Sequence, residues 1–275
     1  VGLAASASSG LPVSFDVSSG LAQITGGTNL SFTGAGEVSI VASQAGDTNW
    51  NAAARATNTF TVTKAEAGVT LHDLSATYDG TAKPATASTV PSGLTVEFTY
   101  NGISSAPVNA GAYAVTGTVN DVMYMGAATG ELVIAKADAL VYLENTNQIY
   151  DGAAKSVTAT TDPSGLTVVI TYDESSSAPT NAGSYVVTAL VSETNWQGGI
   201  TGALVIARSL DAITFSNTNQ TYDGTVRSVT AVAWSGSPVS LTYDGSVSAP
   251  VNAGVYVVTG VVDAANWSAT GVTVL

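Results

Sequence analysis

Apolar and polar residues alternate along most of the chain, which is the pattern of half-buried β-strands. Val96, Phe98 and Tyr100 fall on one side of such a segment, with polar residues between them. The alternation returns in residues 168–172 and 185–191. Segments of helical length with a period of 3.6 residues are absent, so we predict an all-β chain.

Three short strings recur at a constant spacing. The triplet Tyr-Asp-Gly repeats every 72 residues, as Tyr78, Asp79, Gly80, then Tyr150, Asp151, Gly152, then Tyr222, Asp223, Gly224. The string Ala-Pro-x-Asn-Ala-Gly spans residues 106–111, 178–183 and 249–254. A third position holds Tyr124, Trp196 and Trp267, and the two Trp residues follow Asn, as Trp50 does. The chain is therefore built from repeated units.

The strings divide the chain into four units of similar length. We call residues 1–64, 65–136, 137–208 and 209–275 modules 1 to 4. Module 1 lacks the Tyr-Asp-Gly triplet, so it is either a variant unit or one without its first strand. Because the modules are small and their connections short, we expect tandem β-modules that form an elongated rod.

Composition excludes several classes of function. Among 275 residues, 20 acids outnumber 7 bases, and the net charge of −13 disfavours nucleic acid as a partner. Cysteine is absent and histidine occurs once, which removes disulfides, thiolate catalysis and thiolate zinc sites. The apolar runs are too short to span a bilayer, so we expect no membrane insertion.

Residues 65–275 resemble the bacterial MBG repeats of the Tyr-Asp-Gly type, which form tandem arrays in large surface and adhesin-like proteins. The recurring triplet, the Ala-Pro-x-Asn-Ala-Gly string and the endings at 132–136 and 204–208 carry this resemblance. Module 1 looks like the Ig-like units that precede such arrays. The resemblance implies an extracellular or bacterial cell-surface spacer built from tandem small β-sandwich or β-grasp-like modules. Module 2 departs from it with Met123 and Tyr124 in place of Asn-Trp, and module 4 with the segment 234–238.

Acidic residues at repeated positions are candidate calcium ligands. Asp79, Asp151 and Asp223 each precede a glycine, and we interpret them as turn residues rather than ligands, because further oxygen donors do not follow. Acids also stand just after each module boundary, and calcium at the junctions is a less favoured alternative that would use Glu66, Asp138 and Asp211. We therefore expect no cofactor.

Basic residues occupy two further repeat positions. One holds Lys83, Lys155 and Arg227, and the other holds Lys64, Lys136 and Arg208. Lysine at these places invites an isopeptide crosslink, but arginine cannot form that bond. Pairing with acids or covering of a strand edge is favoured instead.

Aromatic residues offer two interpretations. Trp50, Trp196 and Trp267 share a repeat position, so we expect core anchors rather than sugar-stacking platforms. Trp234 stands outside the repeat frame in a loop rich in Ser and Gly. With Tyr243 it is the candidate for contact with a glycan.

Together these features favour a non-catalytic structural spacer of a surface adhesin or fibre. One alternative is a self-assembling filament or sheath subunit, in which an edge at residues 1–10 or 272–275 adds a strand to a neighbour. Another is a glycan-binding module. The expected partners are neighbouring modules of the same polypeptide, then identical subunits or a host or matrix glycan. An enzyme has the least support, because the acids show no convincing catalytic pair.

Overall fold

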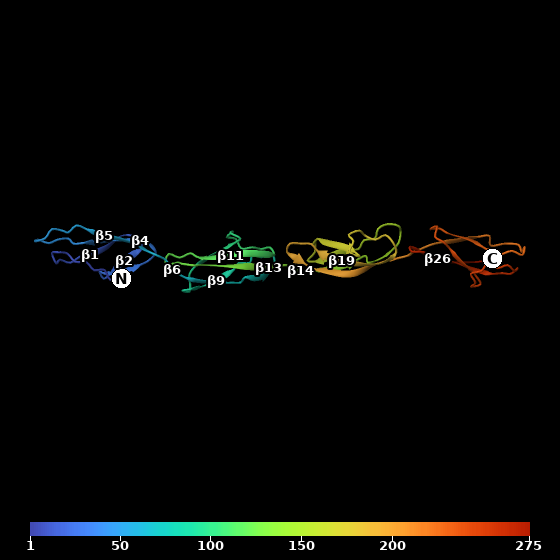
Figure 1. Cartoon of the computed structure of the whole chain (residues 1–275), viewed down its shortest axis with the longest axis horizontal. Helices are drawn as coiled ribbons and strands as arrows, with labels where there is room; N and C mark the ends of the chain where they lie inside the picture. Colours follow the sequence, from blue (N-terminus) through green and yellow to red (C-terminus); the bar gives the residue numbers. More distant parts are fainter. The chain divides into compact units, whose positions relative to one another are not determined.

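The computed structural model describes residues 1–275 and contains strands, turns and loops without a helix (Figure 1). The all-β prediction is therefore confirmed. All strand pairs form inside the four modules. The chain divides into two compact units, Val1–Lys136 and Ala137–Leu275, and each contains two modules. Helices long and apolar enough to cross a membrane are not found.

Module 2 shows the plan of the repeat. Its strands β10, β11, β13 and β8 form one sheet in that order, antiparallel except for the parallel pair β13–β8. The antiparallel pair β7–β9 packs against this sheet, and β6 pairs in parallel with β12. The strands are β6 (Ala65–Glu66), β7 (Gly68–His72), β8 (Ser75–Thr77), β9 (Thr86–Val90), β10 (Val96–Tyr100), β11 (Gly111–Val119), β12 (Tyr124–Met125) and β13 (Ala127–Ala135).

Module 3 repeats this plan strand for strand. Its sheet has the order β16-β21-β19-β18, with the pairs β15–β17 and β14–β20 beside it. The strands are β14 (Ala137–Asp138), β15 (Leu140–Glu144), β16 (Asn147–Ile149), β17 (Thr158–Asp162), β18 (Val168–Tyr172), β19 (Gly183–Val191), β20 (Trp196–Gln197) and β21 (Gly199–Ala207).

Module 4 keeps the plan with one change. Its sheet has the order β22-β27-β26-β25, so β22 pairs in parallel with the first residues of a long β27, and the counterpart of β8 and β16 is not a strand. The strands are β22 (Ser209–Leu210), β23 (Ile213–Ser216), β24 (Thr230–Ala233), β25 (Ser240–Tyr243), β26 (Val257–Asp263) and β27 (Trp267–Val274).

Module 1 has a different and smaller arrangement. A three-stranded antiparallel sheet β1-β4-β5 accompanies the hairpin β2–β3. The strands are β1 (Ser14–Ser19), β2 (Ala22–Thr25), β3 (Asn29–Phe32), β4 (Gly36–Ser43) and β5 (Ala56–Val62). The Leu30 amide donates to the Val1 carbonyl, and the Leu3 amide donates to Thr28. The expected open edge at residues 1–10 is thus wrong for its first three residues, whose backbone is already paired.

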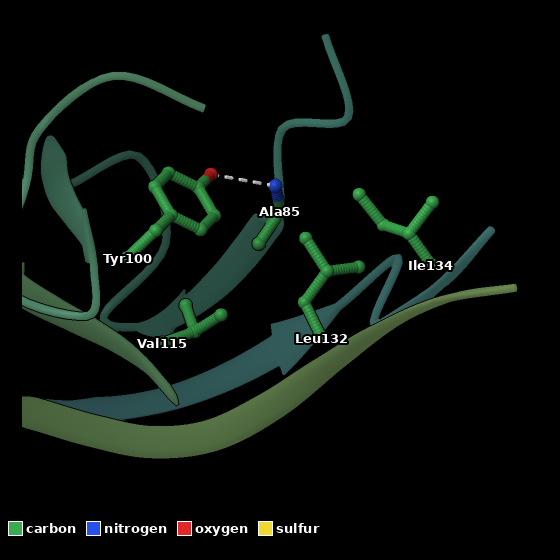
Figure 2. Packing of buried hydrophobic residues seen from close by; sticks show 5 residues of the cluster. All are labelled: Ala85, Tyr100, Val115, Leu132 and Ile134. Carbon is green, nitrogen blue, oxygen red and sulfur yellow. Dashed lines mark hydrogen bonds between the residues drawn. The ribbon is translucent and has the colours of Figure 1, made fainter. Parts of the chain in front are cut away.

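A tyrosine at the end of β10, and of its counterparts β18 and β25, lies in each repeat core. In module 2, Tyr100 packs with Val115, Leu132 and Ile134, and its hydroxyl accepts a hydrogen bond from the Ala85 amide at 2.8 Å (Figure 2). Tyr172 and Tyr243 accept the same bond from Val157 and Val229, at 2.9 and 3.0 Å. The bond satisfies a buried backbone donor from the segment that precedes β9, β17 or β24.

This burial corrects one expectation. Tyr243 is only 5% exposed, so it is part of the core and is unavailable for contact with a glycan. The alternation of its strand indicated a buried side, but the repeated strings drew attention to other aromatic residues.

Glycines inside the strands allow the two layers to approach closely. A Cβ atom at Gly117 of β11 would lie 2.9 Å from Leu71 of β7, and one at Gly271 of β27 would lie 2.9 Å from Phe215 of β23. Glycine within a strand therefore marks the place where a large side chain of the opposite layer enters the core.

The buried tyrosine bond predicts the result of a single substitution. Tyr172→Phe keeps the ring but leaves the buried Val157 amide without a partner, so we expect module 3 to lose about 1–3 kcal/mol of stability. Urea unfolding of the full chain would measure this loss. Tyr142→Phe is the control, because Tyr142 is half exposed. Equal stabilities for both variants would contradict the assignment.

Candidate functional site

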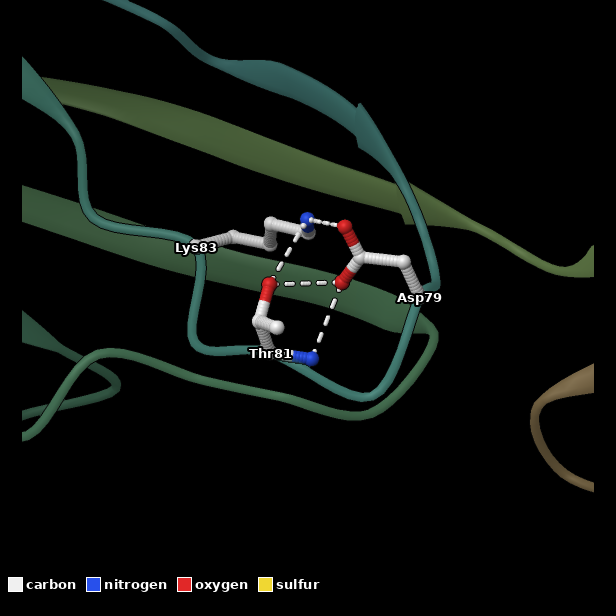
Figure 3. Close-up of polar contacts among 3 residues, drawn as sticks. All are labelled: Asp79, Thr81 and Lys83. Atoms are coloured by element: carbon white, nitrogen blue, oxygen red, sulfur yellow. Dashed lines mark hydrogen bonds and ion pairs between the residues drawn. The ribbon is translucent and has the colours of Figure 1, made fainter.

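The Tyr-Asp-Gly triplet forms a turn in which the aspartate collects several donors. Asp79 accepts hydrogen bonds from the Thr81 amide at 2.9 Å and the Thr81 hydroxyl at 2.6 Å, and Lys83 Nζ lies 2.5 Å from its other oxygen (Figure 3). Gly80 supplies the positive φ of +83° that the turn requires. The Lys83 hydrogen bond, followed by those of Thr81, holds the pKa of Asp79 well below its usual range.

The same turn occurs in modules 3 and 4. Lys155 Nζ lies 2.5 Å from Asp151, and Arg227 pairs with Asp223. The Lys155 hydrogen bond is the main cause that lowers the pKa of Asp151, and the Thr225 hydroxyl is the main cause at Asp223. The three aspartates therefore cap turns and pair with the basic residue four positions later.

A backbone bond joins this turn to the second repeated string. The Lys155 amide donates to the Pro179 carbonyl at 2.8 Å, and Arg227 donates to Pro250 at the same distance. The Tyr-Asp-Gly turn and the Asn-Ala-Gly loop consequently form one surface. In module 3 we call Tyr150, Asn181 and Ala182 the socket.

The socket of module 3 binds the Asn-Trp loop of module 4. Asn266 Oδ1 accepts a hydrogen bond from the Ala182 amide at 2.7 Å, and Asn266 Nδ2 donates to Asn181 Oδ1 at 3.0 Å. The Trp267 ring meets the edge of the Tyr150 ring, with centroids 5.5 Å apart and planes at 82°. The three repeated strings, far apart in the sequence, thus come together at a junction between modules.

Contacts within module 4 hold Asn266 and Trp267 in place. The Ser209 amide donates to the Asn266 carbonyl at 2.9 Å, and the Ala264 amide donates to the Trp267 carbonyl at 3.1 Å. Trp234 lies edge-on against Trp267, with centroids 5.9 Å apart. These contacts orient the loop before it meets module 3, so little freedom is lost on contact.

An ion pair spans the same junction. Arg208, the last residue of module 3, contacts the Asp263 carboxylate of module 4. Both side chains are largely exposed, so the pair adds little to stability and is weakened by salt. Arg208 therefore pairs with an acid, a role that the sequence favoured for this repeat position.

The tryptophans do not have the role expected for them. Trp50 is 52% exposed, while Trp196 and Trp267 are half-buried and lie outside the hydrophobic cores of modules 3 and 4. The interpretation as core anchors is wrong, because buried tyrosines such as Tyr172 and Tyr243 occupy the core instead.

Modules 1 and 2 meet in a different way. The Ala35 amide donates to the Val122 carbonyl at 2.9 Å, and Lys64 Nζ donates to the Asp121 carbonyl at 2.5 Å. Module 1 has no Tyr-Asp-Gly turn and therefore no socket, and module 2 has Met123 and Tyr124 where Asn-Trp would stand. The socket and the Asn-Trp loop are absent together, which supports their role as a matched pair.

The calcium candidates lie in ordinary surface positions. Glu66 is in β6, Asp138 accepts a hydrogen bond from Gln197 at 2.9 Å, and Asp211 accepts bonds from the amides of Ala212 and Ser235. Within residues 1–275, groups of three or more His, Asp or Glu side chains suited to a metal ion are not found.

The glycan candidates do not form a joint site. Trp234 is 79% exposed beside the junction of modules 3 and 4, whereas Tyr243 is buried. Sequence reasoning missed Asn181 and Asn266 as contact residues. Their recurrence beside the aromatic landmarks was the available signal.

Comparison with known proteins places the chain in a family. Its sequence matches the MBG domain over residues 67–138, 139–210 and 212–275, so the chain belongs to the MBG domain family. The resemblance derived from the repeated strings is confirmed. A search of the curated proteins found no match.

Two solved structures are similar at low identity. Sidekick-1 immunoglobulin domains 1–5 share 13% identity with a TM-score of 0.29, and the match covers 95% of this chain and 72% of that chain. Domains 1–6 of the surface layer protein SbsC share 15% identity with a TM-score of 0.21, over 96% of this chain and 49% of that chain. This chain thus spans about half of the SbsC fragment. Neither likeness bears on function.

The junction predicts a change in hydrogen exchange at one amide. Asn266→Ala removes the acceptor of the Ala182 amide, and a hydrogen bond of about 1 kcal/mol corresponds to about fivefold faster exchange. Exchange measured by NMR on the full chain would detect it. The control is Ser268→Ala, which changes a residue of β27 two positions after Asn266. An unchanged Ala182 rate would show that the junction does not protect this amide.

The turn aspartates predict a loss of stability in acid. Their folded-state pKa values are lowered, so their contribution is complete above the unfolded pKa of about 3.9 and is lost as the pH falls through the folded pKa. We expect Asp79→Asn, Asp151→Asn and Asp223→Asn together to flatten the fall in melting temperature below about pH 4. Calorimetry from pH 6 to pH 2 measures this, with Asp16→Asn as control. An equally steep fall in the triple variant would contradict the prediction.

Proposed function

We propose that this chain is a non-catalytic structural spacer of an extracellular bacterial surface adhesin or fibre. The observation that carries the proposal is the use of the repeated residues. Tyr150, Asn181, Asn266 and Trp267 connect one module to the next, and the repeated aspartates stabilise turns. Membership of a tandemly repeated family supports the same role.

The junction of modules 3 and 4 has the physical properties that a spacer requires. Bending it separates the Tyr150 and Trp267 rings and breaks the two hydrogen bonds of Asn266. The connection from β21 to β22 is a single residue, Arg208, which leaves no flexible linker to absorb the motion. Such a junction resists reorientation without calcium or a disulfide.

The two alternatives have less support. For a glycan-binding role, Trp234 is exposed and available for contact, whereas Tyr243 is buried and unavailable. Strand addition at residues 1–10 is disfavoured at Val1 and Leu3, whose backbone already pairs with the segment around β3.

Residual dipolar couplings of the full chain test the spacer role. Because the junction holds modules 3 and 4 together, we expect one alignment tensor to fit the amides of both modules. The double variant Asn266→Ala and Trp267→Ala should require two different tensors. The matched control is Tyr142→Ala, which removes a half-exposed ring of module 3 that makes none of the junction contacts described above.

Two results would overturn the proposal. Independent tensors in the unmodified chain would show that the junction is flexible, and a spacer of this kind would be excluded. Antibodies raised against the purified chain should label intact cells of the source bacterium. Labelling that appears only after lysis would exclude the surface location.

A further inference from the structure

The end of module 4 carries a second copy of the socket. Tyr222, Asn252 and Ala253 hold the same repeat positions as Tyr150, Asn181 and Ala182, and we call them the terminal socket. The turn and loop that present them are joined in the same way, because Arg227 pairs with Asp223 and its amide donates to Pro250.

The terminal socket is open. Tyr222 is 59% exposed, whereas its counterpart Tyr150 is half-buried against Trp267 and the core of module 3. A cavity of about 160 Å³ lies there, lined by Tyr222, Arg227, Asn252, Ala253 and other residues of the same loops. Arg227 Nε is buried without a hydrogen-bond partner. An unpaired buried donor beside a cavity indicates a site that an additional group would complete.

Module 1 carries the matching loop. Residues 47–50, which we call the tip loop, end in Asn49 and Trp50, and both side chains are exposed. The Asp47 amide donates to the Trp50 carbonyl at 2.9 Å, as Ala264 donates to Trp267 in module 4. The Asp47 carboxylate also accepts from the Asn49 and Trp50 amides, at 2.8 and 2.9 Å. The tip loop therefore shares with the Asn266–Trp267 loop the backbone bond that closes it, while its carboxylate contacts match those of Asp121 in module 2.

We propose that the tip loop of a second copy of this chain docks in the terminal socket. By analogy with Asn266 and Trp267, Asn49 would bond the Ala253 amide and Asn252, while Trp50 would pack against Tyr222. A second copy is the expected occupant because its tip loop is exposed. The junction of modules 3 and 4 already shows how an Asn-Trp loop binds a socket. The socketless junction of modules 1 and 2, which also lacks Asn-Trp, shows that the two parts go together.

The contact is head-to-tail, because the loop lies in module 1 and the socket in module 4. Such heterologous contacts build rings when the rotation closes and open filaments when it does not. A contact formed by one loop is small and hence weak. Association should therefore appear only at high protein concentration or when copies are held close together.

Analytical ultracentrifugation of the full chain from about 0.01 to about 1 mM tests the proposal. The average mass should rise with concentration above the 27.4 kDa of one copy. Trp50→Ala and Tyr222→Ala should each weaken association at least about tenfold, since exposed Trp and Tyr residues that become buried dominate small interfaces. Tyr142→Ala, which removes a half-exposed ring away from both ends, should associate like the unmodified chain.

A mixture of the two impaired variants tests directly whether the tip loop of one copy binds the terminal socket of another. Trp50→Ala retains a socket and Tyr222→Ala retains a tip loop, so the mixture should form a dimer and stop there. A chain that stays monomeric at about 1 mM would overturn the proposal. Association that survives both substitutions would also overturn it, and would point to strand addition. The dipolar couplings of modules 3 and 4 decide the spacer role separately.

Discussion

The connection of module 3 to module 4 depends on one contact, which joins Tyr150 and Asn181 to the Asn266–Trp267 loop. It combines a ring contact, which is apolar and tolerant of small shifts, with two hydrogen bonds that permit one orientation. Neither part needs a metal or a covalent bond. A module of about 70 residues can therefore gain a defined neighbour from the same short strings that mark its sequence.

The structure separates two tasks among aromatic residues that look alike in sequence. Tyr100, Tyr172 and Tyr243 enter the cores and satisfy a buried amide, so their loss affects the stability of one module. Trp267 and Tyr150 are half-buried and meet each other across the junction, although Tyr150 also packs against the core of module 3. The turn aspartates connect the two tasks, because the basic residues they hold tie the Tyr-bearing turn to the Asn-bearing loop.

Alternation and periodicity predicted the strands, the absence of helices and the repeated units, because both are local properties of the chain. The turn role of Asp79 followed from the glycine after it, which supplies a positive φ angle. Trp267 was misplaced because a shared repeat position does not say whether a neighbouring module or the residue's own core covers it. Tyr243 was misplaced although the alternation of its strand indicated a buried side. A residue covered by the next module and a residue covered by its own core produce the same pattern.

The sequence by itself determined the β class, the repeat length and the family, because these follow from backbone preferences and recurring short strings. Only the tertiary structure decided that Asn181, Tyr150 and Trp267 belong to one contact. The loop and the socket are more than eighty residues apart in the sequence. The physical reason is that sheet pairing brings the turn and the loop of one module to the same end. Their joint surface exists only after the chain has folded.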